Sequence, residues 1–469
     1  MKKAPLLILA SLLLLAGCVN KNSNTSKDDS DSRSETSQET SSEESSSEEV
    51  IEDLDVDIET NVAVEGKSKR YSETFTYNSA YFEDESSSFN KNIALLSYGL
   101  SSATQSREAM YNFLGGIRFK DIYLSPSFYA DPTEDSIGYA FSHKQISKEQ
   151  HLLIVSIRGF NYGAEWSNNF DLGKEGNHAG FTRSASTILE DLDKYIVNHS
   201  QQSSKLLITG YSRGGAVANV LSDMLFRRET DKKLIKDENV YTYTFEAPKG
   251  LVEKVEYENV FNVINDMDPI PLIAPEQYGF YRCGIDVNIG RSDIDEFIKK
   301  YDETYELPAF TPNEEEYQNE QEFASSLIDK VVTYDSEERP VKTRKQFVDN
   351  AQGTFQYFMS MFFSLKDSTV DSLKTYLTTA EMWDLLPIIA SGEGMHDFFK
   401  PYLDEDGYQY DDAELLEQCT ALQLLLTAGP GLIILSTYLA SADNLTRAIN
   451  MHYPEINFAL LKAYDPDVK

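Results

Sequence analysis

The chain contains the run Leu206-Leu-Ile-Thr-Gly-Tyr-Ser-Arg-Gly-Gly215, which sets Ser212 between an apolar stretch and a second stretch of helical spacing. The first stretch predicts a buried strand, and residues 216–226 predict a helix. When a strained strand-to-helix turn holds a serine, the residues two places before and after it must be small, as Gly210 and Gly214 are. The run therefore predicts a nucleophilic serine at position 212. The alternative is a glycine-rich turn in which the serine is incidental.

Strand-like and helical segments alternate on both sides of this turn. The strand-like segments are 136–142, 152–157, 239–245 and 260–264, and the helical ones are 90–116, in two pieces, and 182–198. Strands that alternate with helices predict a mainly parallel sheet with helices on both of its faces, which is the α/β class.

Residues 292–440 have a different character, with long helical segments, aromatic clusters and no clear strand signal. We interpret this region as a large helical insertion over the carboxyl edge of the sheet, where it would form a lid or an acyl pocket. A plain helical subdomain with its own core is the alternative.

The first residues have the features of an export signal. Residues 1–3 are a short basic start, residues 4–14 are apolar but too few to span a membrane comfortably, and Leu15-Ala-Gly-Cys18 follows. This start resembles a bacterial lipoprotein signal, in which cleavage after residue 17 leaves a lipidated Cys18 as the new N-terminus. We therefore expect residues 1–18 to be a signal and the protein to be extracytoplasmic, anchored to the bacterial cell membrane through lipid on Cys18. An ordinary secretion signal or an uncleaved anchor is the alternative.

Residues 19–60 are mostly Ser, Glu and Asp, and no apolar residue stands between Val19 and Val50. Such a segment cannot bury enough apolar surface to offset the entropy lost on ordering, so we expect a disordered acidic tether. The segment carries about a third of the net charge of −35.

The remaining part of the chain is still acidic, which argues against nucleic acid as a partner and mildly favours neutral substrates. With Cys18 assigned to lipid, Cys283 and Cys419 remain. Two cysteines form no disulfide framework and no metal-ligand cluster, so we expect no metal site. Whether these two cysteines pair with each other is left open.

A serine hydroxyl needs an imidazole to accept its proton and a carboxylate to orient that imidazole. In hydrolases with this kind of turn the chain order is nucleophile, acid, histidine, and only His396 and His452 follow Ser212. We favour His452, which lies in a loop before a closing helix that Pro454 could start, over His396, which lies inside the helical insertion. The upstream histidines are out of order and are interpreted as surface or structural residues: His143, His151, His178 and His199.

The acid has two candidates, Asp266 and Asp268, which follow the strand-like segment 260–264 at the start of a Pro-rich turn. A carboxylate just past the end of a strand is well placed to meet the histidine loop. Either residue could instead cap the turn.

Six short motifs now stand in order along the chain. They are Ile157-Arg-Gly159, His178-Ala-Gly-Phe181, the Gly210–Gly214 turn, Phe245-Glu-Ala-Pro-Lys-Gly250, Asn265-Asp-Met-Asp-Pro-Ile-Pro271 and His452-Tyr453. Together they resemble the class 3 lipase family, the fungal-lipase-like branch of the α/β-hydrolases. The resemblance covers much of the segment from about residue 90 to residue 271 and then the stretch near His452. It implies an α/β-hydrolase core at 61–291, interrupted by the insertion at 292–440 and completed by 441–469.

The resemblance also implies an activity and a set of site residues. It implies hydrolysis of carboxylic esters, often acylglycerols, by Ser212, Asp268 and His452, without a metal or an organic cofactor. It places the oxyanion hole at the backbone amides of Phe160 and Arg213. In that family a Ser or Thr commonly stands where Phe160 is, so this chain lacks the hydroxyl that helps to bind the oxyanion.

These observations predict a lipid-anchored serine hydrolase that acts on a lipid or a small ester through an acyl-enzyme. Two other functions fit the same residues. One is an acyltransferase or thioesterase that uses the same three side chains. The other is a catalytically silent surface-binding lipoprotein on the same fold, which the missing hydroxyl at Phe160 would favour.

Overall fold

The computed structural model describes most of the chain from residue 56 to residue 304 and a smaller part of residues 305–469. The described residues are 56–62, 71–130, 133, 136–159, 165, 168–169, 171–199, 204–268, 270–272, 274, 276–290, 293–304, 342–349, 392–405, 411–413, 415–416, 419 and 451–466. The proposed signal with Cys18, most of the proposed tether and most of the region 292–440 lie outside them.

A seven-stranded sheet forms the centre of the described fold, with its strands in sequence order from β3 to β9. The strands are β3 Lys120–Leu124, β4 Tyr139–Gln145, β5 His151–Ile157, β6 Ser204–Tyr211, β7 Val240–Phe245, β8 Val260–Ile264 and β9 Ile285–Asn288. The first three pair antiparallel and those from β5 to β9 pair parallel. Every residue of β6, β7 and β8 is buried, as expected for parallel strands that are covered on both faces.

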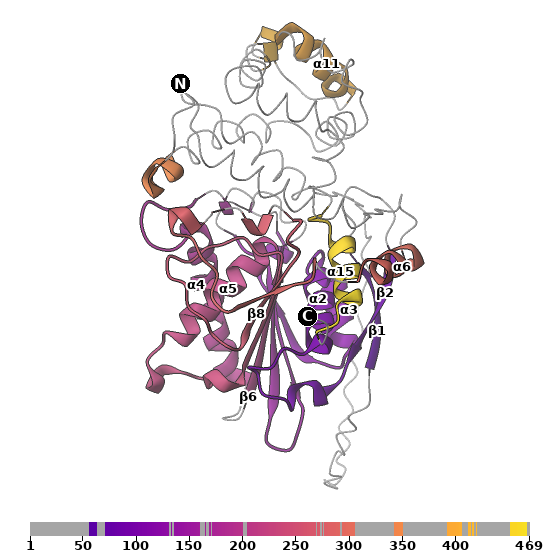
Figure 1. Ribbon diagram of the computed structural model, residues 1–469, viewed down its shortest axis with the longest axis vertical. Helices are drawn as coiled ribbons and strands as arrows, with labels where there is room; N and C mark the ends of the chain where they lie inside the picture. Colours follow the sequence, from indigo (N-terminus) through magenta and orange to yellow (C-terminus); the bar gives the residue numbers. More distant parts are fainter. Residues whose placement is uncertain are drawn as a thin grey trace, which may run out of the picture.

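Helices cover the two faces of this sheet (Figure 1). Helices α4 (Ala179–His199) and α5 (Arg213–Phe226) bury one apolar cluster against one face. Helices α2 (Lys91–Ala103), α3 (Arg107–Gly116) and α15 (Pro454–Ala463) bury a second cluster against the other. The predicted α/β class, with a mainly parallel sheet and helices on both faces, is therefore confirmed.

The helix starts follow from local sequence. Asn90 precedes α2, and its side-chain oxygen accepts hydrogen bonds from the amides of Asn92 and Ile93 at 2.9 and 3.3 Å. Ser106 caps α3 in the same way through the amide of Ala109 at 3.1 Å. Pro454 is the first residue of α15, as the sequence predicted, because proline lacks the amide hydrogen that this position leaves unused.

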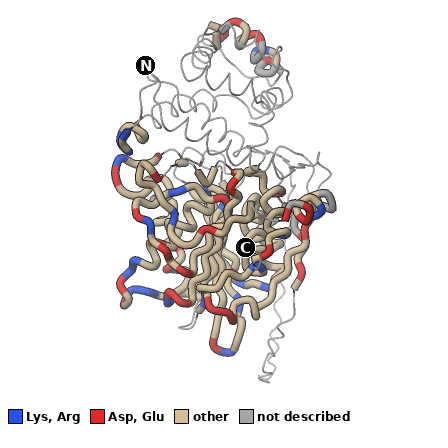
Figure 2. The backbone as a smooth tube through the Cα atoms, in the orientation of Figure 1, with Lys and Arg blue, Asp and Glu red and all other residues tan. Residues whose placement is uncertain are grey.

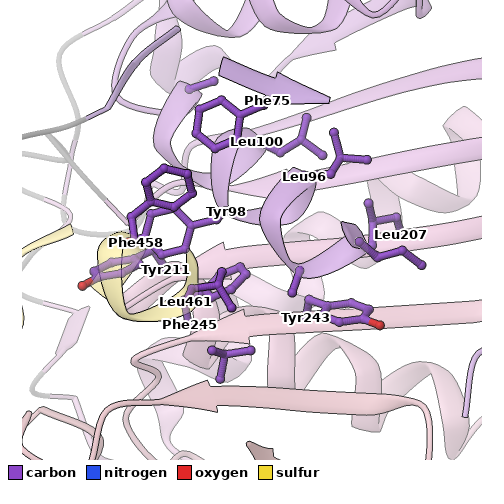
Figure 3. Packing of buried hydrophobic residues seen from close by; sticks show 14 of the residues in the cluster. Phe75, Leu96, Tyr98, Leu100, Leu207, Tyr211, Tyr243, Phe245, Phe458 and Leu461 are labelled. Carbon is purple, nitrogen blue, oxygen red and sulfur yellow. The ribbon is translucent and has the colours of Figure 1, made fainter. Parts of the chain in front are cut away.

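Aromatic side chains fasten the C-terminal helix to the sheet (Figure 3). The ring of Phe458 on α15 lies 5.0 Å from the rings of both Phe75 and Tyr98. Tyr98 in turn packs edge-on against Phe245 of β7 at 4.9 Å and against Tyr211 of β6 at 5.7 Å. Such ring pairs add to the free energy gained by burying apolar surface. The packing places the start of α15 beside the carboxyl end of β6.

A separate two-stranded antiparallel sheet pairs β1 (Val56–Val62) with β2 (Tyr71–Tyr77). Val56 and Ile58 are partly buried against the cluster that α2 and α3 form, while the intervening Asp57 is exposed. Alternation of this kind is typical of a half-buried strand. The fold therefore begins before the boundary predicted at residue 60, because the last residues of the proposed tether have the pattern of a strand.

The described parts of the region 292–440 are helical. They include α6 (Ile294–Thr304) and α11 (Gly392–Glu405), and residues 344–349 are also helical. Phe297 of α6 is buried in the same cluster as α15. Whether the insertion acts as a lid stays a prediction. Within the described residues, no helix combines the length and the apolar character that a membrane span requires.

The close approach of β6 to α5 gives a test of the fold. A Cβ atom added at Gly210 would collide with the backbone carbonyl group of Gly214. We expect Gly210→Ala to lower the free energy of unfolding by about 2 kcal/mol or more, since backbone atoms cannot move aside cheaply. Urea denaturation followed by circular dichroism measures this.

Gly115→Ala is the matched control, because a Cβ atom there would meet nothing within 4 Å. Gly115 lies near the end of α3, where alanine has the higher helix propensity, so this variant should be as stable as the parent or more stable by up to about 1 kcal/mol. Equal stability of the Gly210→Ala variant and the parent would contradict the proposed close approach.

Candidate active site

Ser212 lies at the junction of β6 and α5 in a strained backbone conformation. Its φ is 51° and its ψ is −121°, an uncommon combination for a residue other than glycine. The amide of Ser212 donates to the carbonyl oxygen of Phe245 at 2.7 Å, which ties the turn to the neighbouring strand β7. A Cβ atom at Gly214 would collide with the carbonyl oxygen of Ile157 on β5. The residues two places before and after Ser212 are thus small because strands and helix pass so closely, as the sequence predicted.

His452 and Asp268 complete a hydrogen-bonded series with this serine. The Nε2 atom of His452 lies 2.9 Å from the Oγ atom of Ser212, and its Nδ1 atom lies 2.5 Å from Oδ2 of Asp268. The other oxygen of Asp268 accepts from the amide of Ile270 at 2.8 Å. All three side chains are buried, with Asp268 fully inaccessible. An imidazole that donates from Nδ1 to the carboxylate presents the Nε2 lone pair to the serine hydroxyl, which is the arrangement that a general base requires.

The competing candidates lie elsewhere. Asp266 accepts a hydrogen bond from the side chain of Asn288 at 2.7 Å. His396 on α11 has its Nδ1 atom 3.2 Å from its neighbour Asp397 and its Nε2 atom 3.4 Å from Asp412. The structure thus brings together the three residues that the sequence favoured.

Among the upstream histidines, His178 has a structural role. It is buried and stacked on Phe181 at 3.7 Å, its Nδ1 atom accepts from the amide of Phe181, and its Nε2 atom lies 3.0 Å from the carbonyl oxygen of Asn169. Burial lowers the pKa of His178 to about 4, so that the ring is neutral at physiological pH. The other three, His143, His151 and His199, gather at another part of the sheet.

Three polar side chains that the sequence did not single out position the histidine loop. The Tyr211 hydroxyl donates to the carbonyl oxygen of His452 at 2.7 Å. The Asn457 side chain donates to the Tyr211 oxygen at 2.9 Å and to the carbonyl oxygen of Met451 at 2.8 Å. Asn265 joins this network by donating to Asn457 Oδ1 at 3.1 Å. Tyr211 and Asn265 lie within the quoted motifs, but nothing in a single sequence assigns these hydrogen bonds to them.

A second buried carboxyl group lies behind Asp268. Glu246 follows β7 with a φ of 47°, and its carboxyl oxygens accept from the amide of Asn265 at 3.0 and 3.1 Å. Its burial and the nearby Asp268 carboxylate raise the pKa of Glu246 well above its ordinary value of 4.5. The raised pKa favours the protonated form of Glu246, whose carboxyl group is hydrogen-bonded to Asp268.

Arg158, Glu165 and Arg213 form a buried ionic network. Glu165 is fully buried and pairs with Arg158 at 2.5 Å and with Arg213 at 3.5 Å. Arg213, the residue after Ser212, is 1% exposed and also donates to the carbonyl oxygen of Ser136 at 3.4 Å. The Arg213 side chain therefore forms a salt bridge. Its backbone amide opens α5 beside Ser212, whereas Phe160, the other predicted oxyanion residue, lies outside the described residues.

The two cysteines that remain after Cys18 are both free and buried. Cys283 belongs to the cluster beneath α4 and α5, and burial raises the pKa of its thiol beyond the range in which it would ionise. Burial raises the pKa of the Cys419 thiol to about 11. Each is therefore a small core residue.

The fold and this hydrogen-bonded series define an α/β-hydrolase type of protein. Residues 154–278 match the model of the class 3 lipase family, a segment that includes Ser212 and Asp268 and ends before His452. The resemblance to class 3 lipases is therefore confirmed over these residues.

Comparison with curated proteins found no match. Solved structures similar to this chain include fungal lipases. The lipase from Rhizopus microsporus var. chinensis is 17% identical over 44% of this chain and 77% of that chain, with a TM-score of 0.32. The Rhizomucor miehei triacylglyceride lipase is 17% identical over 43% and 82%, with a TM-score of 0.31. Lipase II from Rhizopus niveus is 15% identical over 44% and 83%, with a TM-score of 0.31.

The raised pKa of Glu246 predicts a pH dependence of stability. Above pH 4.5 the unfolded chain releases this proton while the folded protein keeps it, so the group lowers the free energy of unfolding as the pH rises. Glu246→Gln keeps a donor toward Asp268 without a titrating group. The free energy of unfolding of Glu246→Gln relative to the parent should therefore increase between pH 5 and pH 8, in urea denaturation at each pH. A difference that does not change with pH would show that Glu246 is ionised in the folded protein.

Proposed function

We propose that this protein is a serine hydrolase of carboxylic esters, of the lipase or esterase type. The single observation that carries the proposal is the series Ser212–His452–Asp268, with its contacts of 2.9 and 2.5 Å at the strained turn. The match of residues 154–278 to class 3 lipases supports the same activity.

The reaction follows from the geometry. The Oγ atom of Ser212 attacks the ester carbonyl carbon and gives its proton to Nε2 of His452, while Asp268 stabilises the resulting imidazolium through Nδ1. The imidazolium then protonates the leaving alcohol, and an acyl-enzyme on Ser212 remains. Water attacks this ester with His452 again as the base, which releases the carboxylic acid and restores the serine.

The tetrahedral intermediate needs donors for its oxyanion. We assign these to the backbone amides of Arg213 and Phe160. The ionic network around Glu165 supports this assignment, because it holds both Arg213 and Arg158, which precedes the Phe160 segment. Each donor of this kind is worth about 3 kcal/mol of transition-state stabilisation. Phe160 itself adds no hydroxyl to this stabilisation.

The proposed substrates are acylglycerols or small neutral esters. The family match supports a lipid-like ester, and the acidic composition, with Lys and Arg interspersed among the more numerous Asp and Glu along the described chain (Figure 2), supports a neutral substrate over an anionic one. An acyltransferase or thioesterase would use the same residues, and it would be recognised by a preference for an acceptor other than water or for a thioester.

Ser212→Ala should lower ester turnover about a thousandfold or more, with little change in thermal stability, because it removes the nucleophile and leaves the packing intact. It should also abolish labelling by a fluorophosphonate probe, which requires an activated serine. The measurements are hydrolysis of p-nitrophenyl esters of graded chain length and in-gel detection of the probe. A catalytically silent binding protein would leave the parent chain unlabelled, and this result would refute the proposal.

Matched variants separate the residues of the series from their neighbours. His452→Ala should resemble Ser212→Ala, whereas His396→Ala should retain parental turnover. Asp268→Asn should lower turnover strongly, whereas Asp266→Asn should not. Reversed effects within either pair would show that the residue chosen is wrong.

The cellular location is part of the proposal and rests on the sequence of residues 1–18. We propose that lipid on Cys18 anchors the protein outside the cytoplasmic membrane and that the acidic segment after it holds the catalytic body away from the lipid surface. Lipid on Cys18 should carry the mature protein into the detergent phase of a Triton X-114 separation, and Cys18→Ser should move it to the aqueous phase. A parent chain found in the aqueous phase would contradict the anchor.

A further inference from the structure

Three of the six histidines of the chain, His143, His151 and His199, lie close together and far from Ser212. His143 lies on β4, and His199 is the last residue of α4. The ligating atoms of these two and of Asp121 on β3 all lie within 4.8 Å of one another. His143 pairs in register with Leu153 on β5, near the start of that strand, whereas Ser212 follows the end of β6. The cluster is therefore about 20 Å along the sheet from the proposed active site.

The spacing within this cluster suits a small metal ion. Nε2 of His143 lies 3.6 Å from Oδ2 of Asp121, and Nδ1 of His199 lies 3.8 Å from the same oxygen. Zinc binds imidazole nitrogen and carboxylate oxygen at about 2.0–2.2 Å in tetrahedral geometry, which separates neighbouring ligand atoms by about 3.4 Å. The two His–Asp distances exceed this value by only 0.2 and 0.4 Å, and all three ligating atoms lie within 4.8 Å of one another.

The hydrogen bonds of Tyr195 determine which nitrogen of His143 carries the proton. The Tyr195 hydroxyl donates to the carbonyl oxygen of Asp121 at 2.9 Å, so its oxygen is left to accept from Nδ1 of His143 at 3.1 Å. The Nε2 atom of a neutral His143 therefore directs a lone pair at the carboxylate of Asp121. Two electron-rich atoms that face each other in this way repel, and a cation between them would remove the repulsion.

The surroundings have two further features of a metal site. A metal-binding histidine usually has its second nitrogen held by a hydrogen bond, as Tyr195 holds that of His143. Asp121 has a φ of 50°, and the pairing of β3 with β4 is irregular between Lys120 and Tyr123. A bulge of this kind redirects a side chain out of the regular strand, here toward the two histidines.

We propose that Asp121, His143 and His199 form a binding site for one divalent transition-metal ion of the Zn²⁺ type. Two imidazoles and one carboxylate favour zinc over the oxygen-preferring Ca²⁺ and Mg²⁺. Asp121 is 56% exposed and His199 is 33% exposed, so water can reach the fourth position. The ion ties the C-terminal end of α4 to the edge strand β3 and to its neighbour β4. The sequence predicted no metal site because the two cysteines left after Cys18 form no ligand cluster. Asp121, His143 and His199 are 22 or more residues apart and form no local motif.

The experiment uses the full chain, freed of metal with EDTA and dialysed, and titrated with ZnCl₂ in a calorimeter. One Zn²⁺ should bind per chain, and excess Zn²⁺ should raise the thermal unfolding temperature by a few degrees, because the ion binds the folded state. Absence of stoichiometric binding to the parent chain would overturn the proposal.

Variants locate the ion. His199→Gln and Asp121→Asn should each weaken Zn²⁺ binding about a hundredfold or more and remove the metal-dependent rise in unfolding temperature. In EDTA both variants should unfold within a few degrees of the parent, which shows that the fold is intact. His396→Ala removes a histidine outside the cluster and should bind Zn²⁺ as the parent does. Unchanged binding by His199→Gln and Asp121→Asn would assign the ion to another part of the chain and overturn the proposal.

Discussion

The candidate active site depends on one long-range contact, the packing of α15 onto the sheet. Ser212 and His452 are separated by 240 positions along the chain. Closing a loop of that length costs about 5 kcal/mol of chain entropy beyond a constant term. Phe458, Leu460 and Leu461 of α15 are each 1% exposed or less, and burying three such side chains contributes roughly 5–9 kcal/mol. The aromatic contacts between Phe458 and its neighbours on α2 and β2 are therefore what hold the base near the serine.

Polar groups then fix the positions of the side chains and backbone in the candidate active site. Apolar packing fixes α15 as a body, but the hydrogen bonds of Tyr211, Asn265 and Asn457 fix the backbone of the histidine loop. Glu246 has a different role, because its raised pKa favours a protonated carboxyl group beside Asp268 in the buried site. Burial, and after it the adjacent Asp268 carboxylate, raise the pKa of Glu246.

The sequence predicted the sheet from β4 to β8 and the helices beside it, because these segments have clear apolar periodicity. It missed β3 and β9, edge strands of five and four residues with exposed positions, since a short exposed strand has little apolar signal. Ser212 was predictable because a strained turn restricts residue types locally. His452 was favoured over His396 by its place before the helix that Pro454 starts, whereas the choice of Asp268 over Asp266 required the resemblance to a family. Glu246, Asn457 and the Asp121 cluster could not be predicted, because their contacts exist only in three dimensions.

The order of the chain has a consequence for synthesis. The segment with His452 leaves the ribosome 240 residues after Ser212, which at ordinary translation rates is on the order of ten seconds or more. During that interval a nascent chain carries the serine without its base. The proposed chemistry is therefore withheld until the chain is nearly finished, and incomplete chains are inert toward the lipids they meet.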